Sequence, residues 1–191
     1  MAAPSSGSLV FEDGLLGTQG TGIDNSSSFE ITVDDTTLTL ATTVVGDIFN
    51  ITATGTGIEG GAANLGDNIF NTEAGEVFTL SFDNDGTLDS IEIQTLALQS
   101  TPDTLSITFT NITAATAPVV QNLSISGGAE SNVSVPVDLL FSSGDLITVE
   151  ITNGPSVDSD FRLESVTATI PEPGTMVLSA LGVGLMLFRR R

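Results

Sequence analysis

Residues 76–98 read EVFTLSF-DNDG-TLDSIEIQTLAL, in which a short polar segment separates two runs rich in apolar residues. Phe78, Leu80 and Phe82 alternate with polar residues, which indicates a strand that buries one face. Asp83-Asn84-Asp85-Gly86 interrupts the alternation, and an Asp-Gly pair is typical of a turn whose glycine takes a positive φ. A second strand is expected over 88–98. The stretch therefore predicts two β-strands joined by a tight turn.

The same pattern recurs on both sides of this stretch. Asp34-Asp35 separates two alternating runs and predicts a hairpin. Pro136 lacks a backbone donor, which places its strand at a sheet edge, and a phase change within 161–170 predicts a β-bulge. Residues 55–68 are glycine-rich and are expected to form a long loop. The further strands are expected over 9–12, 29–33, 37–45, 47–54, 104–111, 119–126, 132–139, 145–152 and 161–170.

About ten short strands, without an amphipathic helix, are typical of an all-β sandwich, and a barrel is the second choice. Residues 1–169 are long enough to form one domain with a real core. Most of the ten phenylalanines fall on the inward phase of the strands, which predicts that they belong to this core.

The last residues, 170–191, differ from everything before them. Pro171-Glu172-Pro173-Gly174 cannot continue a helix or a central strand. An uncharged apolar run over 175–188 follows, and Arg189, Arg190 and Arg191 close the chain. As a helix the run would be roughly 21 Å long, short for a bilayer core of about 30 Å. A short membrane helix over about 175–188 with a cytoplasmic arginine cluster is the expectation, and a buried core helix is the alternative.

These three parts in this order resemble the PEP-CTERM sorting signal of Gram-negative bacteria. The resemblance implies a precursor anchored in the inner membrane and recognised by an exosortase, a membrane protease that cleaves near Pro171-Glu172-Pro173. The body would then reach the cell surface or the medium, often among exopolysaccharide. Residues 60–68, 73–82 and 86–91 also resemble a jelly-roll ectodomain of such proteins, which is similar in outline to carbohydrate-binding modules.

The body is strongly acidic. The chain has 24 Asp and Glu against four basic residues, and Arg162 alone of these four precedes the tail. Such a charge repels nucleic acid and favours cations. Residues 1–8 show neither the basic nor the apolar part of an export signal, so we expect one upstream of Met1.

Composition argues against catalysis. His, Cys, Lys and Tyr are absent, so the usual bases, nucleophiles and zinc ligands are missing, and we expect no enzyme. Trp and Tyr, the usual platforms for sugar rings, are also missing. The acceptor pattern for N-glycosylation occurs at Asn25, Asn50, Asn111, Asn122 and Asn132.

Calcium is the cofactor that the acidic turns would take, because it prefers carboxylate and carbonyl oxygens. Asp83, Asp85 and Asp89 form the strongest candidate group, although the full calcium-loop pattern is absent. Asp24-Asn25, Asp67-Asn68 and Asp158-Ser159-Asp160 are other oxygen-rich turns. The competing interpretation is that Asp, Asn and Gly only form the turns.

Two classes of function remain. The first is an exported structural protein of the cell surface or extracellular matrix, associated with exopolysaccharide. The alternative is a carbohydrate- or calcium-binding module that carries the same tail.

Overall fold

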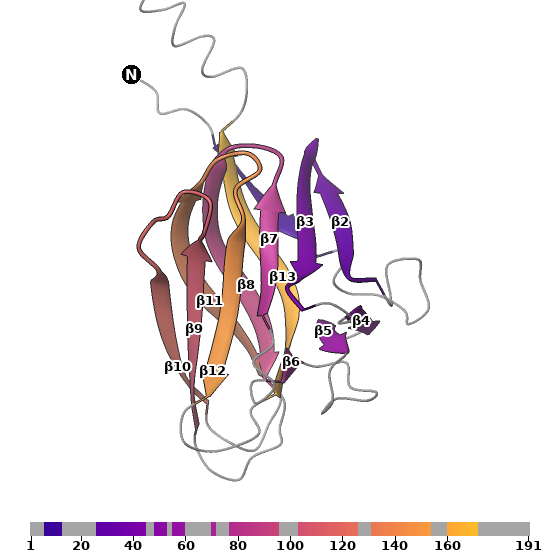
Figure 1. Cartoon of the computed structure of the whole chain (residues 1–191), viewed down its shortest axis with the longest axis vertical. Helices are drawn as coiled ribbons and strands as arrows, with labels where there is room; N and C mark the ends of the chain where they lie inside the picture. Colours follow the sequence, from indigo (N-terminus) through magenta and orange to yellow (C-terminus); the bar gives the residue numbers. More distant parts are fainter. Residues whose placement is uncertain are drawn as a thin grey trace, which may run out of the picture.

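The fold is seen in a computed structural model, which describes residues 6–12, 26–44, 48–52, 55–59, 70–71, 77–95, 103–125, 131–153 and 160–171 (Figure 1). The expected C-terminal helix over 175–188 lies outside these residues. The described elements are strands: β1 (Ser6–Phe11), β2 (Ser28–Val33), β3 (Thr36–Thr42), β4 (Ile48–Thr52), β5 (Gly55–Glu59), β6 (Phe70–Asn71), β7 (Val77–Phe82), β8 (Gly86–Thr95), β9 (Asp103–Asn111), β10 (Val119–Ile125), β11 (Ser131–Phe141), β12 (Ile147–Asn153) and β13 (Asp160–Pro171).

The strands form two antiparallel sheets, which confirms the all-β class and its layered form. Sheet A has the order β11-β8-β13-β5-β4, with β1 and β6 also paired to β13. Sheet B has the order β10-β9-β12-β7-β3-β2. The chain passes between the sheets after β1, β3, β6, β7, β8, β10, β11 and β12. Consecutive strands share a sheet only in β2–β3, β4–β5–β6 and β9–β10 among the described elements.

The core lies between the sheets and is built from the inward residues of both. Phe78, Leu80 and Phe82 of β7 are buried, as their alternation predicts. Phe82 stacks on Phe141 with a ring-centroid separation of 4.3 Å and meets Phe11 edge-on at 5.6 Å. Phe29, Phe49 and Phe109 are buried as well, which confirms the core assignment for the phenylalanines whose side chains are described.

The Asp34-Asp35 hairpin is confirmed, and both residues take positive φ, 46° and 63°. Such a pair of left-handed residues is what a two-residue hairpin turn requires. The expectation for Gly86 is wrong, because it begins β8 without a positive φ. A Cβ there would lie 2.6 Å from the Thr169 carbonyl oxygen and 2.9 Å from the Phe141 ring, so glycine is needed for close approach.

The expected edge strand and the expected bulge are both confirmed. Pro136 lies in β11 at the edge of sheet A, and the pairing register shifts between Pro136 and Leu139, where Asp138 has a φ of 54°. β13 shifts register after Leu163, and a second shift follows Thr167.

The loop expected over 55–68 is partly wrong, because β5 begins at Gly55. β5 pairs with β4 along its length and meets β13 at Thr56, and Thr56 and Ile58 are fully buried. Packing against two neighbouring strands therefore outweighs the low strand propensity of glycine. The two-residue strand β6 was not expected from the sequence either.

Candidate functional site: the tail junction, the acidic turns and the outer faces

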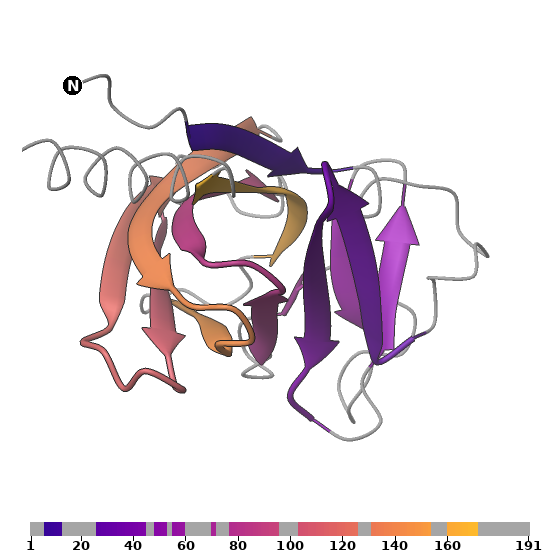
Figure 2. The same ribbon diagram turned by 90° about the horizontal axis from the view of Figure 1, so that it is seen from above.

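The tail begins inside sheet A. Residues from Val166 to Pro171 of β13 pair with β1, and the ladder ends with Ser6 opposite Pro171. Pro171 is exposed at the end of this ladder, and Figure 2 shows β1 running from that end of β13 toward the β2–β3 hairpin. The first proline of the expected sorting motif is thus held by the fold. Glu172, Pro173 and Arg189 to Arg191 lie outside the described residues.

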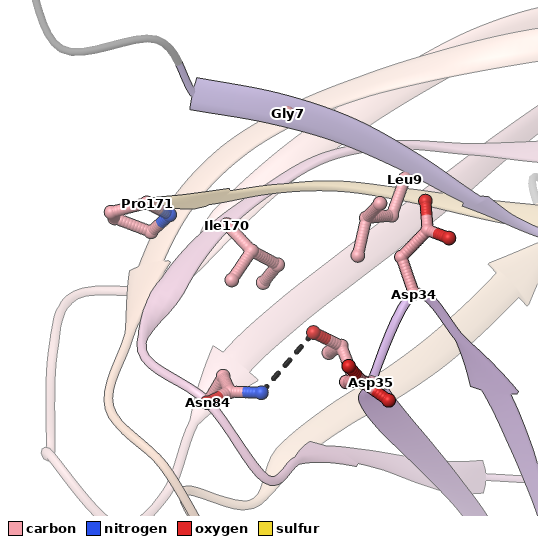
Figure 3. A pocket seen from close by; sticks show the side chains of 8 residues that line it. Gly7, Leu9, Asp34, Asp35, Asn84, Ile170 and Pro171 are labelled. Atoms are coloured by element: carbon pink, nitrogen blue, oxygen red, sulfur yellow. Dashed lines mark hydrogen bonds between the residues drawn. The ribbon is translucent and has the colours of Figure 1, made fainter. Parts of the chain in front are cut away.

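A hollow of about 300 Å³ lies beside this junction (Figure 3). Leu9 of β1 and Ile170 of β13 supply an apolar wall, and the Asp34-Asp35 turn supplies an acidic rim. Asn84 closes another side, with its Nδ2 donating to Thr36 Oγ1 at 3.1 Å. The hollow thus lies between the paired strands β1 and β13 of sheet A and the Asp34-Asp35 hairpin of sheet B.

Asp83 and Asp85 are engaged in hydrogen bonds between loops. Asp83 Oδ1 accepts from the Thr37 backbone N–H at 2.8 Å, and Asp85 Oδ1 accepts from that of Ser143 at 2.8 Å. The Ser143 hydroxyl donates to the Asp83 carbonyl oxygen at 2.7 Å, and the Gly144 N–H donates to the Phe82 carbonyl oxygen at 2.8 Å. These bonds tie the first residues of β3, the β7–β8 turn and the β11–β12 loop together at the upper end of the molecule in Figure 1.

Asp89 has a different surrounding. It lies on β8, and its Oδ2 accepts from the Thr169 hydroxyl of β13 at 2.7 Å. Among the residues that the structure describes, no three Asp, Glu, His or Cys side chains gather closely enough to hold a metal ion. The structure therefore does not bring Asp83, Asp85 and Asp89 into one calcium group. The turns at 24–25, 67–68 and 158–159 lie outside the described residues.

Sequence reasoning missed a second corner at this end, built on Asn111. Its side chain is fully buried at the end of β9, where Nδ2 donates to Asp145 Oδ2 at 2.8 Å and Oδ1 accepts from the Ala114 N–H at 2.9 Å. The Ser142 N–H also donates to Asp145 Oδ2, at 2.9 Å. The hydrogen bonds from Asn111 and from Ser142 hold the pKa of Asp145 below its usual value. Asn111 is thus a structural residue and presents no accessible amide for glycosylation.

The outer face of sheet A carries polar and charged groups. Glu164 accepts a hydrogen bond from Asn132 Nδ2, and Arg162 donates to Gln94 Oε1 at 3.2 Å. Partial burial, and then the charge of Glu92, raise the pKa of Glu164. Folding therefore disfavours the ionised form of Glu164. The resulting loss of stability develops as the pH rises from the ordinary pKa of a glutamate through the raised pKa of Glu164.

The outer face of sheet B has a different chemistry. Thr148 of β12 lies opposite Thr110 of β9 on one side and opposite Thr79 of β7 on the other, so threonines form a row across three strands. Glu30 and Glu150 are the carboxylates at outward positions of β2, β3, β7, β9 and β12. We call this surface the hydroxyl face; its members are Thr32, Thr37, Thr39, Thr79, Ser81, Ser106, Thr108, Thr110, Thr148 and Thr152.

The hydroxyls of this face keep hydrogen-bonding capacity. Thr148 Oγ1 and Thr79 Oγ1 each donate to a carbonyl oxygen of a neighbouring strand at 3.3 Å. Thr152 Oγ1 donates in the same way to the Ser106 carbonyl oxygen at 3.4 Å. A hydroxyl that donates once retains lone pairs that can accept. The face thus presents hydroxyl oxygens that can accept further hydrogen bonds.

Comparison with known proteins identifies the tail. Residues 169–191 match the family model of the PEP-CTERM protein-sorting motif, while no curated protein matches the chain. The match starts within β13, so the motif and the fold share Thr169, Ile170 and Pro171. Over the part of the chain that the structure describes, no helix is long and apolar enough to cross a membrane.

Proposed function

From the PEP-CTERM motif, which implies an exported protein sorted by exosortase, we propose a structural protein of the cell surface or extracellular matrix that associates with exopolysaccharide. The proposed role is non-catalytic. The observation that carries the proposal is the hydroxyl face, a broad surface of sheet B with few carboxylates on a chain with a formal charge of −20.

The chemistry of this face suits a polysaccharide. Sugar hydroxyls donate and accept hydrogen bonds, as threonine and serine hydroxyls do. Many cell-surface polysaccharides are anionic, and a surface with few carboxylates is where they approach an acidic protein at the least electrostatic cost. Contacts that exchange hydrogen bonds with water are individually weak, so the proposed binding depends on many contacts along an extended chain.

The calcium-dependent alternative receives less support. The carboxylates of Asp83, Asp85 and Asp89 already accept hydrogen bonds from three different parts of the fold. A calcium ion would have to displace these donors, because it needs six to eight oxygen ligands.

The proposal is tested by cosedimentation of the full chain with exopolysaccharide purified from the producing cells. We expect retention that is equal in calcium, in magnesium at matched ionic strength, and after chelation. Retention that requires calcium would favour the alternative, and no retention in any arm would overturn both.

The junction also limits where the sorting cleavage falls. Because the β1–β13 ladder extends to Pro171, a cut upstream of Pro171 would shorten the ladder that covers this edge of sheet A. We propose that the mature chain ends at Pro171 or beyond it. Mass spectrometry of protein recovered from the cell surface should find this end, whereas an intact Arg191 on the surface would contradict processing.

A further inference from the structure

The hollow beside the tail junction and the sorting motif share residues. Ile170 and Pro171 line the hollow, and both belong to the matched stretch 169–191. Figure 3 shows Leu9, Ile170 and Asp34 around the same space, with Pro171 at the end of its strand. A protein that binds the chain at Pro171 therefore also meets the hollow and its acidic rim.

The two carboxylates of this rim differ from the other carboxylates at the same end of the molecule. Asp83, Asp85 and Asp145 each accept a hydrogen bond that the fold requires. Within the described residues, neither the Asp34 nor the Asp35 carboxylate accepts a hydrogen bond or forms an ion pair, and both residues are exposed. The rim thus carries two negative charges that the fold itself does not use.

The chain has few cations of its own that could neutralise this rim. Lys and His are absent, and Arg162 donates to Gln94 on the outer face of sheet A. Arg189, Arg190 and Arg191 follow the apolar run that is expected to enter the membrane, so they are expected on its cytoplasmic side. A positive group at this rim therefore comes from another molecule.

We propose that the hollow receives a lysine or arginine side chain of the exosortase that cuts the chain at the motif. The wall of Leu9 and Ile170 suits the aliphatic stem of such a side chain, and the carboxylates of Asp34 and Asp35 pair with its charged end. A volume of about 300 Å³ is at the lower limit of ordinary ligand pockets, which suits a single side chain. The inference rests on the exosortase processing that the motif implies and is independent of polysaccharide binding.

The hairpin allows a variant that removes the charges and keeps the turn. Asp34 and Asp35 both have positive φ, which asparagine adopts at least as readily as aspartate, so Asp34→Asn/Asp35→Asn should be as stable as wild type in urea denaturation. In the producing cells, pulse–chase labelling should show that its precursor matures about fivefold more slowly than wild type. Asp138→Asn/Glu30→Gln is the matched control, because it removes two exposed charges that do not line the hollow, and it should mature as wild type does.

Salt provides a second test, with the purified full chain added to detergent-solubilised membranes of the producing cells. Raising NaCl from about 0.1 M to about 1 M shortens the Debye length from about 10 Å to about 3 Å. Cleavage of wild type should slow toward the rate of Asp34→Asn/Asp35→Asn, and cleavage of that variant should change less. Equal maturation of the hollow variant and wild type, or equal slowing of the control, would overturn the docking proposal alone. Wild type that stays full length would overturn the processing on which it rests, and the docking proposal with it.

Discussion

The turn end of the sandwich and the hydroxyl face of sheet B use polar residues in opposite ways. At the turn end, the side chains of Asn111, Asp83 and Asp145 form hydrogen bonds that join segments distant in the sequence. On the hydroxyl face, Thr79 and Thr148 donate only long bonds to adjacent strands. Removing polar groups that hold distant segments together should lower the stability of the fold, whereas removing partly exposed hydroxyls that form only long hydrogen bonds should change it little. Changes at the turn end should therefore affect stability, and changes on the face should affect binding.

The largest loss of stability is expected for Asn111→Ala. The change leaves the Ala114 N–H without its acceptor and removes a donor from the Asp145 carboxylate, at a cost of roughly 3 kcal/mol in the free energy of unfolding. Urea denaturation checks this value. Asn122→Ala, at an exposed position, is the control and should stay within about 0.5 kcal/mol of wild type. Similar losses for both variants would remove the distinction between the two regions.

A smaller effect, which depends on pH, is expected at Asp145. Its pKa is lowered by the hydrogen bonds from Asn111 and Ser142, so its ionised form stabilises the fold. This stability is present above the ordinary pKa of an aspartate and is lost as the pH falls through the lowered value. Asp145→Asn should therefore melt below wild type at neutral pH, and the difference should shrink in acid. A difference that is constant or grows in acid would mean that the carboxylate charge is not the cause.

The smallest effect on stability is expected on the hydroxyl face. Thr79→Val together with Thr148→Val removes two hydroxyls and keeps branched side chains that suit a strand. We expect a change within about 0.5 kcal/mol by urea denaturation, because the lost donor bonds are long and partly exposed. A loss in the free energy of unfolding as large as that of Asn111→Ala would show that these hydroxyls stabilise the fold. It would weaken the assignment of this face as a contact surface.

The sequence predicted those features of the fold that depend on the local alternation of apolar and polar residues. Alternation located most strands, and it placed the phenylalanines in the core because a strand turns every second side chain inward. It missed β5, whose glycines pack well only because β4 and β13 flank them. It also misjudged Gly86, because the close approach of the Thr169 carbonyl comes from a strand distant in the chain.

The prediction of functional residues was also limited by contacts between residues that are distant in the sequence. The tail was recognised because its three parts are contiguous in the sequence. Asp83, Asp85 and Asp89 looked like a calcium group because they are close in sequence, yet in the fold each accepts from a separate donor. Asn111 and Asp145 are 34 residues apart, and only the pairing of β9 with β12 brings them together.

The most direct test of the account measures polysaccharide binding by two face variants and one turn variant of the full chain. Thr79→Val/Thr148→Val should lose retention on the producing cells' exopolysaccharide, whereas Thr79→Ser/Thr148→Ser, which keeps both hydroxyls, should retain it. Asp145→Asn, at the turn end, should also bind as wild type does. Retention unchanged by the valine pair, or lost only in Asp145→Asn, would contradict the claim that the hydroxyl face makes the contact.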